Sequence, residues 1–566
     1  MAWSDTTSDT TVDAVAYDKR GRSRSKSLQE SICPPEDIDV QLPDEEETEE
    51  TAGRGIGALH HIRSRTRSRT DETVIRWAYN DPENPFNWSN PKKAMVVFTC
   101  GMLVLNSTMG TSLPSMIVPQ LTKDWGVTSQ EQKVLPISVF MIGYVIGPLI
   151  WGPLSEHVGR RMMLIVTFAI FTLFTMACAL APNWPSLLVF RLVCGVTGSA
   201  PVAVVAGILA DVYGNPRERG RAYAVFQATT LFGPLFAPIV SGYCSDTLGW
   251  RWSFWIAVIS AAAALWMVLF IPETYGPILL YRRAKKMRKQ DPPLRVISPR
   301  DLETTDLNQL LTVVLTRPLR MLFSELIVST TCAYLALCYA IFYMFFQAYP
   351  IIFQQLYSLP PGLTGLCYLP IGGGTLLSLP LFWCWDVVLA RATARGSPWT
   401  KREEFRRLPL ALLGGPSFVI ALFWLGWSAK SSVPFVAPML AGIPFGFGFM
   451  LIFVPLLNYL TDAYDIYAAS AASVASMARS LLAVLLPLAT SHMFQDLGIS
   501  GACSLLGGLT AGMCLIPFIF IWKGPSIRER SKLCITLRER REELARRTEE
   551  ERLRIESPGQ NEKESV

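Results

Sequence analysis

Apolar residues gather in runs of about 20 to 25 residues from Lys93 onward, and short polar breaks separate these runs. A helix of this length crosses a bilayer, because each residue rises about 1.5 Å and the hydrocarbon core is about 30 Å thick. The pattern therefore predicts twelve membrane-spanning helices, at 94–118, 135–154, 162–181, 185–211, 222–243, 252–271, 321–346, 362–385, 408–428, 433–456, 468–490 and 502–522. An even number places both termini on the same side of the membrane.

The longest break between apolar runs, residues 272–320, divides the predicted helices six and six. This division favours an all-α membrane protein built from two pseudo-symmetric six-helix bundles, 93–271 and 321–523, joined by a central loop. Residues 1–92 contain "RGRSRSKS" and "PDEEETEE" and few large apolar residues, so they are predicted to be a disordered tail. Residues 524–566 form a charged C-terminal tail.

Composition agrees with a membrane protein. The chain is 50% hydrophobic and 17% charged, with a mean hydropathy of +0.29, whereas about a quarter of the residues of a soluble domain are charged. The net charge of +6 lies mainly in the tails and loops, so it indicates orientation in the membrane rather than a nucleic-acid partner. Most of the twelve cysteines lie in apolar runs, and only four histidines occur, so we expect no metal site and no bound cofactor.

Lysine and arginine gather in alternate loops between the predicted helices. The basic loops are 159–161, 215–221, 281–289 and 400–407. The loops between them, such as 181–186, carry little positive charge, while the acidic stretch 461–470 is an exception among the basic set. The positive-inside bias therefore predicts that both termini are cytosolic. We expect a multi-pass protein of the cell membrane, with the vacuolar membrane as the alternative.

One basic loop interrupts the apolar pattern sharply, in "WGPLSEHVGRRMML" (151–164). Its glycines permit a tight turn and close helix approach, and its arginines can reach acidic groups or the carbonyl ends of neighbouring helices. Asp211 ends the fourth predicted helix on the same side, so we expect it to pair with Arg160 or Arg161. The sequence thus predicts a charged clasp at a helix junction.

Several motifs carry a family resemblance. "GPLSEHVGRR" resembles the signature loop of the major facilitator superfamily, with Glu156 where aspartate is commonest. "RLVCGVTGSAPVAVVAGILADVYGNPRERGRA" resembles its fourth-helix pattern, and "GPLFAP" is similar to the antiporter motif of its fifth helix, with Ala237 in place of the second glycine. "NDPENPFNWSNPKKA", "PETYGPILLYRRAKKMRK", "FFQAYPIIF" and "LNYLTDAYDIYAASAASVASMARSLLAVLLPL" resemble fungal members of the twelve-span drug:proton antiporter family.

The resemblance implies the major facilitator fold and proton-coupled efflux of drugs, fungicides or toxic secondary metabolites by alternating access, with the proton gradient as the energy source. The expected transport and gating residues are Gly152, Glu156, Gly159, Arg160, Arg161, Arg191, Asp211, Gly233, Pro234, Pro238 and Arg479. In the family, the arginine at position 191 is associated with proton coupling, and the glycine and prolines of "GPLFAP" with a hinge or proton seal.

Each of these assignments has a structural alternative. An unpaired cation at the bilayer centre costs about 2.5 to 3.5 kcal/mol, so Arg191 and Arg479 must face a polar interior, where they can simply tie carbonyls and hydroxyls together. Gly233, Pro234 and Pro238 can equally produce a helix bend without a role in transport.

An aromatic stripe indicates where a substrate binds. Tyr339, Tyr343 and Phe346 share one face of the seventh predicted helix, and Gln347 follows them. Such a wall suits a small lipophilic or amphipathic substrate, although aromatic stripes also serve packing alone. Asn458 and Asp462 share a face near the end of the tenth predicted helix and are either ligand contacts or part of a second clasp.

Other functions stay open from the sequence. Export of polyamines by the same family would favour acidic side chains in the cavity, and a membrane sensor that keeps the fold without transporting would use the long tails. The sequence contains no G-x-x-x-x-G-K-[ST] loop, histidine cluster or nucleophile motif, so we do not expect an enzyme. The expected partners are the substrate, protons and the lipid bilayer, and the protein is expected to be a monomer.

Overall fold

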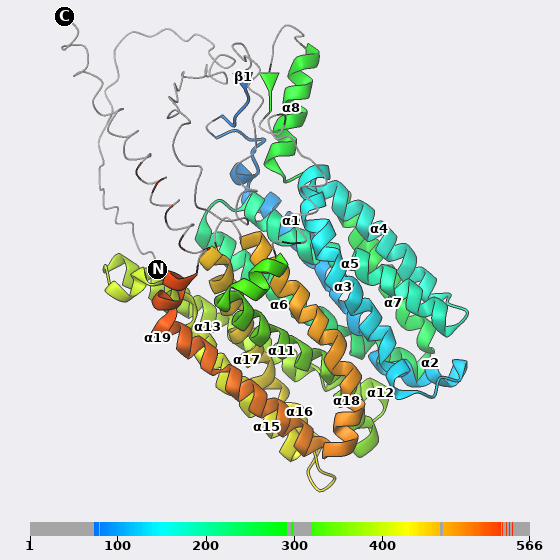
Figure 1. Cartoon of the computed structure of the whole chain (residues 1–566). Coiled ribbons are helices and arrows are strands. Elements are labelled where there is room, and N and C mark those ends of the chain that lie inside the picture. The colour runs from blue at the N-terminus through cyan, green and yellow to red at the C-terminus, as the bar shows by residue number, and fades with distance from the viewer. Residues whose placement is uncertain are drawn as a thin grey trace, which may run out of the picture. The chain divides into compact units, whose positions relative to one another are not determined.

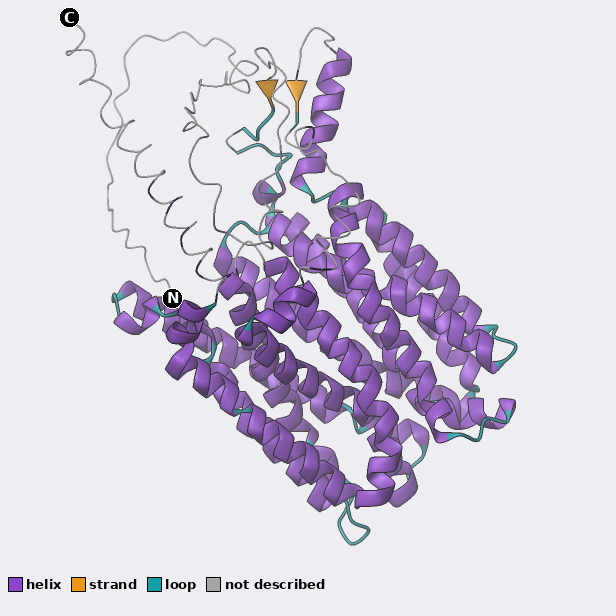
Figure 2. Cartoon of the chain, in the orientation of Figure 1, coloured by secondary structure: helices purple, strands orange, loops and turns teal. Residues whose placement is uncertain are grey.

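The computed structural model describes residues 73–78, 80–290, 296–298, 318–464 and 468–531, with positions 301, 316, 533, 535, 539, 543 and 546. Nearly all of this described chain is helical (Figure 2). It forms two compact units, of which the smaller holds the described residues of Met1–Asp81 and Leu280–Leu302. Much of the predicted tails and of the central loop lies outside the described residues.

The smaller unit contains two short strands, drawn in orange in Figure 2. β1 (Thr73–Val74) pairs in parallel with β2 (Val296–Ile297). Ile75, directly after β1, packs with Ala284 of α8 (Gly276–Gln290) in an apolar cluster. A segment of the predicted N-terminal tail is therefore joined to the central loop.

The boundary of the predicted disordered tail needs correction. The sequence predicts disorder over residues 1–92, but β1, the short helix η2 (Pro85–Asn87) and the first turn of α1 lie within this range. The physical reason is that the few apolar residues here find partners far along the chain. Ile75 packs on the central loop, and Trp88 is buried in the core of the larger unit. Residues 1–72 lie outside the described part of the chain.

The larger unit is a bundle of long helices in two halves (Figure 1). The first half comprises α1 (Asn90–Ser112), η3 (Leu113–Met116), α2 (Val118–Trp125), α3 (Gln130–Val158), α4 (Arg160–Ala179), α5 (Trp184–Val212), α6 (Pro216–Thr247) and α7 (Trp250–Val268). The second half comprises α11 (Leu326–Tyr349), the π-helix η4 (Pro350–Leu356), α12 (Pro361–Leu366), α13 (Leu369–Ala394), η5 (Pro398–Lys401), α14 (Glu403–Arg407), α15 (Pro409–Ser428), α16 (Val436–Leu440), α17 (Gly442–Tyr464), α18 (Ala468–Met513) and α19 (Leu515–Arg530).

Eleven helical segments of the described chain are long and apolar enough to cross a membrane. The last of them, Ser470–Glu529, has 60 residues, which is about three times the length that one crossing needs. It breaks at Gly498, whose φ of +69° lies in the left-handed region that glycine adopts without strain. Figure 1 shows the chain reversing direction within α18, so this segment provides the last two of the twelve predicted crossings.

The loops that join α3 to α4 and α5 to α6 lie at one end of the larger unit, which we call the Arg160 end. The short helices α2 and α12 lie at the opposite end, which we call the far end (Figure 1). Large apolar side chains such as Phe98, Trp266 and Trp427 are more than half exposed on the outside of the bundle. An apolar outer surface of this extent is typical of helices that contact lipid.

Glycines let the helices of each half approach closely. A Cβ atom on Gly195 of α5 would lie 2.1 Å from the Phe140 carbonyl oxygen of α3, and one on Gly143 would lie 2.3 Å from the Val196 nitrogen. In the second half, a Cβ on Gly446 of α17 would lie 1.9 Å from the Ile371 carbonyl oxygen of α13. Small residues at such contacts are the usual means by which membrane helices pack.

Candidate functional site

Arg160, at the start of α4, is held by hydrogen bonds and an ion pair. Its Nε donates a hydrogen bond to Asp211 Oδ2 at 3.2 Å, and its Nη1 donates to Ser155 Oγ at 2.6 Å. The Arg160 side chain is only 8% exposed. A Cβ on Gly207 of α5 would lie 2.7 Å from Arg160 Nη2, so the guanidinium lies directly on the α5 backbone. The structure thus brings Arg160 and Asp211 together and adds Ser155 and Gly207 to the predicted clasp.

Glu273 is the main residue of this network that the sequence analysis missed. It follows α7, is 4% exposed, and accepts hydrogen bonds from the backbone nitrogens of Arg160 at 3.0 Å and Arg161 at 3.3 Å. These nitrogens belong to the first turn of α4 and have no partner within the helix, so the carboxylate caps the helix and opposes the positive end of its dipole. Glu273 also accepts from the backbone nitrogens of Thr274 and Tyr275.

The two glycines of the charged loop play different parts. Gly159 joins α3 to α4 with a φ of +110°, and a Cβ there would lie 2.5 Å from Glu273 Oε2. The turn and the approach of Glu273 therefore both require glycine. Gly152 has no atom within 4 Å of the position of a Cβ, so the expected close helix approach at Gly152 is wrong.

Arg161 and Glu156 lie at the edge of the clasp. Arg161 does not contact Asp211; its Nη2 donates to the Leu269 carbonyl oxygen at 2.7 Å, at the end of α7. Glu156 Oε1 lies 3.6 Å from Arg160 Nη2, and the Glu156 side chain is 53% exposed. An ion pair this exposed contributes about 0 to 1 kcal/mol.

A second charged cluster lies at the same end in the second half. Asp462 Oδ2 accepts a hydrogen bond from Arg407 Nε at 2.8 Å, and Glu404 forms an ion pair with Arg528 of α19 at 2.8 Å. Neither Asp462 nor Asn458 lines the central cavity described below. Of the two alternatives from the sequence, the geometry supports a second cluster for Asp462 and gives no support to a ligand contact for either residue.

The "GPLFAP" segment of α6 packs closely against α1. A Cβ on Gly233 would lie 1.9 Å from Thr108 Oγ1. Pro238 has no N–H to bond the Pro234 carbonyl oxygen one turn earlier, and Ser112 Oγ donates to that oxygen at 2.7 Å instead. The segment therefore joins α6 to α1, and Pro234 also lines the central cavity.

Arg191 of α5 is buried within the first half, and each of its three side-chain nitrogens donates a hydrogen bond to a backbone carbonyl oxygen. Nε donates to the Pro136 oxygen at 2.8 Å, Nη1 to the Gly110 oxygen at 2.6 Å, and Nη2 to the Thr111 oxygen at 3.1 Å. The residue one turn after Gly110 is Pro114, which cannot bond the Gly110 carbonyl. Arg191 thus supplies hydrogen-bond donors to carbonyl oxygens at the end of α1. This agrees with the alternative from the sequence, in which Arg191 ties backbone groups together.

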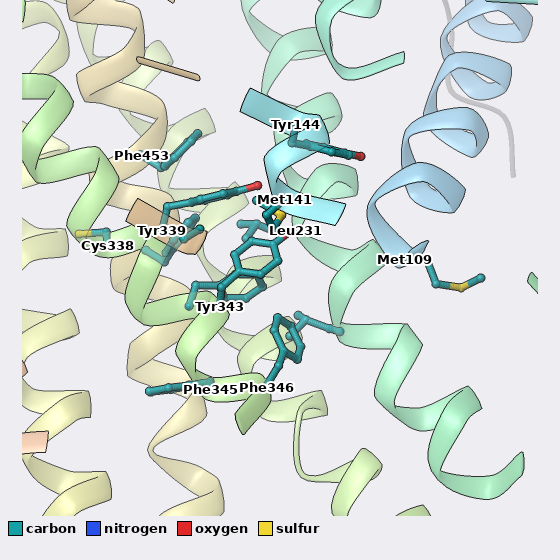
Figure 3. Close-up of a cluster of buried hydrophobic side chains, with 14 of the residues drawn as sticks. Met109, Met141, Tyr144, Leu231, Cys338, Tyr339, Tyr343, Phe345, Phe346 and Phe453 are labelled. Atoms are coloured by element: carbon teal, nitrogen blue, oxygen red, sulfur yellow. The ribbon is translucent and has the colours of Figure 1, made fainter. Parts of the chain in front are cut away.

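A central cavity lies between the two halves. Its walls come from α6 of the first half and from α11, α17 and α18 of the second, and the lining residues are Gln227, Thr230, Leu231, Pro234, Tyr339, Phe342, Tyr343, Phe449, Met450, Phe453 and Arg479. Figure 3 shows the Tyr339, Tyr343 and Phe453 side chains in the surrounding cluster of buried residues, with Leu231 and Met141 from the first half. The cavity measures about 20 Å³, which is room for about one water molecule.

The structure divides the predicted aromatic stripe. Tyr339 and Tyr343 line the cavity, whereas Phe346 stacks on Tyr368, with 5.3 Å between the ring centroids. Neither Phe346 nor Gln347 is among the described residues that line the central cavity. The side-chain nitrogen and oxygen of Gln347 are buried and have no hydrogen-bond partner within the described chain. Gln227 and Thr230 line the cavity but were not predicted, because the apolar pattern does not show which face of α6 meets the second half.

The two halves are bonded to each other at the far end. Asp246 Oδ2 of α6 accepts a hydrogen bond from the Gly362 backbone nitrogen of α12 at 2.9 Å, and a Cβ on Gly365 would lie 2.5 Å from the Pro238 carbonyl oxygen. Nearer the centre, Tyr343 Oη donates to Thr111 Oγ1 at 3.0 Å. In contrast, the contacts described above for Arg160 stay within the first half and those of Glu404 within the second.

Two halves of membrane-spanning helices around a cavity define a multi-pass transporter of the major facilitator fold. The model of the Major Facilitator Superfamily matches residues 100–487, and the chain belongs to this superfamily. Within the described residues, no three His, Cys, Asp or Glu side chains are placed to hold a metal ion.

Fungal transporters are among its relatives. The chain is 35% identical to an ascochitine biosynthesis cluster MFS transporter of Didymella fabae, over 82% of this chain and 90% of the relative. It is 33% identical to the major facilitator superfamily multidrug transporter mdrA of Aspergillus fumigatus, over 81% of this chain and 76% of the relative. In fold it is similar to the proton:xylose symporter XylE, with a TM-score of 0.56 and 17% identity over 77% of this chain and 96% of XylE.

Proposed function

We propose that this protein is an efflux transporter that exports drugs, fungicides or toxic secondary metabolites by alternating access. The central cavity carries this proposal, because aromatic side chains line it where the two halves meet. A cavity of this kind suits a lipophilic or amphipathic molecule. Separation of the halves at one end and then at the other would expose it to each side of the membrane in turn. Relatives that are named a multidrug transporter and a biosynthesis cluster transporter support export as the direction.

The proton gradient is the proposed energy source. The sequence has no phosphate-binding loop for nucleotide hydrolysis, and its motifs resemble those of drug:proton antiporters. In this proposal the protein acts as a monomer, without an enzymatic step or a bound cofactor. Arg191 contributes by fixing the ends of α1 and α3, because its described hydrogen bonds all go to backbone carbonyl groups.

Transport by vesicles tests the proposal. Inside-out vesicles from cells that express the protein should accumulate members of a fungicide panel when a proton gradient is imposed. A protonophore should abolish this accumulation, and vesicles without the protein should show none. Accumulation that persists after the gradient collapses would exclude proton coupling, and the absence of accumulation for the whole panel would argue against export of this substrate class.

We place both termini and the central loop in the cytosol, and the protein in the cell membrane with the vacuolar membrane as the alternative. The basic loops at the Arg160 end support this orientation. Lys285 on α8 is exposed and offers a site for a cysteine. A Lys285→Cys variant should react with an impermeant maleimide only after the cells are opened, whereas labelling of intact cells would reverse the orientation. Fluorescence microscopy of a tagged chain distinguishes the two membranes.

A further inference from the structure

The central cavity contains an arginine with few partners. The one hydrogen bond described for the Arg479 side chain runs from Nη2 to Ser476 Oγ at 3.2 Å, one turn away on α18. Arg479 Nε is buried and has no hydrogen-bond partner within the described chain. The ion pairs between described residues do not include Arg479. The cavity therefore holds a guanidinium most of whose N–H groups have no acceptor among the described residues.

Two aromatic rings hold the Arg479 guanidinium in place. Its Cζ atom lies 5.3 Å from the centroid of the Tyr339 ring and 5.3 Å from that of the Phe453 ring. Ring faces attract a cation but cannot accept its in-plane N–H groups as a carboxylate does. The rings thus fix the position of the guanidinium, while Ser476 Oγ is the one acceptor that the described chain gives its N–H groups.

The other walls of the cavity do not supply a negative charge. Gln227 and Thr230 contribute neutral polar groups from α6, and none of the described lining residues is acidic. Arginine stays charged in proteins, so the cavity carries a net positive charge. An organic cation would be repelled here, and a neutral ligand would leave the positive charge uncompensated.

We infer that the central cavity selects amphipathic organic anions, in which an aromatic body packs against Tyr339 and Tyr343 while a carboxylate or similar group accepts hydrogen bonds from Arg479. This inference rests on the proposed export function and gives it a substrate class. It also argues against polyamines as the cargo, because a polyamine is a cation. The present cavity of about 20 Å³ is too small for such a ligand, so the anion enters when the halves separate.

Binding to the purified full chain in nanodiscs tests the inference. The probes are 2-naphthoic acid, an aromatic anion at pH 7, and 2-naphthamide, a neutral compound of the same shape, with binding measured by calorimetry. The wild-type chain should bind the acid at least about tenfold more tightly than the amide. In Arg479→Gln this ratio should fall to about one, mainly through weaker binding of the acid. Arg479→Lys should give an intermediate ratio, because it keeps the charge but loses the planar fork.

A matched control is Arg251→Gln. Arg251 on α7 is exposed, stacks on Trp250 with its Cζ 4.3 Å from the ring centroid, and does not line the cavity. This variant makes the same charge change and should keep the wild-type ratio. Equal binding of acid and amide by the wild type, an unchanged ratio in Arg479→Gln, or no binding of either compound would overturn the inference. Tighter binding of 2-naphthylmethylamine, the matched cation, would overturn it as well.

The binding experiment needs no proton gradient, so its result is independent of the vesicle transport result that tests the proposed function. If vesicles export neutral fungicides while the nanodisc protein does not distinguish the acid from the amide, export stands and anion selection falls. If the acid binds in an Arg479-dependent manner but vesicles move no compound, the site stands and the export function falls.

Discussion

Arg191 and Arg479 are both arginines in membrane-spanning helices, but their surroundings differ. The Arg191 nitrogens donate to three backbone carbonyl groups inside the first half. Arg479 faces the cavity between the halves and has one hydroxyl partner and two aromatic rings. Arg191 therefore joins helices of the first half, whereas most N–H groups of Arg479 have no acceptor within the described chain. The two arginines thus differ in their partners, although both lie in membrane-spanning helices.

The strongest test of this comparison is Arg191→Ala. The substitution removes the Arg191 donors to the Gly110, Thr111 and Pro136 carbonyl groups, and a buried group left unpaired costs about 1 to 3 kcal/mol. We expect a loss of at least about 3 kcal/mol in unfolding free energy, severalfold less protein in the membrane, and no proton-coupled export. Arg191→Lys should restore part of each. Thermal unfolding, membrane abundance and vesicle transport are the measurements. An abundant Arg191→Ala variant that still concentrates substrate would contradict the structural role.

Arg160 is a third arginine with different partners. Its side chain donates to Asp211, and Glu273 accepts from its backbone nitrogen at the start of α4. Glu273→Gln weakens the acceptor for the Arg160 and Arg161 backbone nitrogens, so we expect a loss of about 1 to 3 kcal/mol in unfolding free energy. Transport should fall in Glu273→Gln, and it should also fall in Arg160→Ala and Asp211→Asn while those two variants still reach the membrane. Normal export by all three variants at equal abundance would show that the clasp has no part in transport.

Arg479→Gln should have a small effect on stability, in contrast to Arg191→Ala. It removes one hydrogen bond and two ring contacts but also removes a buried unpaired N–H, so we expect a change below about 1 kcal/mol. Thermal unfolding of the nanodisc protein measures this. If Arg479→Gln lost as much unfolding free energy as Arg191→Ala, Arg479 would also be a structural arginine, and the proposed difference between the two residues would be wrong.

The smallest effect is expected for Glu156→Gln. The Glu156 carboxylate lies 3.6 Å from Arg160 Nη2 and is half exposed, so the pair contributes at most about 1 kcal/mol. Export and thermal unfolding should stay close to those of the wild type. A clear loss of export would show that the charge at position 156 matters to transport in a way that its contacts in this structure do not explain.

The sequence predicted the helices and part of the clasp. The spacing of apolar runs placed the crossings, because a membrane-spanning helix must be long and apolar whatever it packs against. The pair Arg160 and Asp211 followed from its position at two helix ends on one side. The role of Glu273 was not predicted, although it lies in the motif "PETYG". It accepts from the backbone nitrogens of Arg160 and Arg161, more than 100 residues away, and every residue type except proline has such a nitrogen, so the sequence does not identify this contact.

The lining of the cavity was predicted less well. Helices such as α6 and α11 are apolar on most faces, so their sequences do not show which face meets the other half. Of the predicted stripe, Tyr339 and Tyr343 line the cavity, and Phe346 stacks on Tyr368. The sequence places Arg479 in a membrane-spanning helix, but its small number of partners within the described chain, which distinguishes it from Arg191, is a property of the packed structure.

The turn at Gly498 joins the last two crossings directly. α18 reverses there without a separate loop, and Ser500 Oγ just after the turn donates to the Gly426 carbonyl oxygen of α15 at 2.8 Å. With so short a connection, the last two crossings form one helical hairpin whose second arm packs on α15, where a Cβ on Gly426 would lie 2.5 Å from Cys503 Cβ. Removal of the chain after Gly498 would leave the preceding crossing without its antiparallel partner and would expose the apolar face of α15 to lipid.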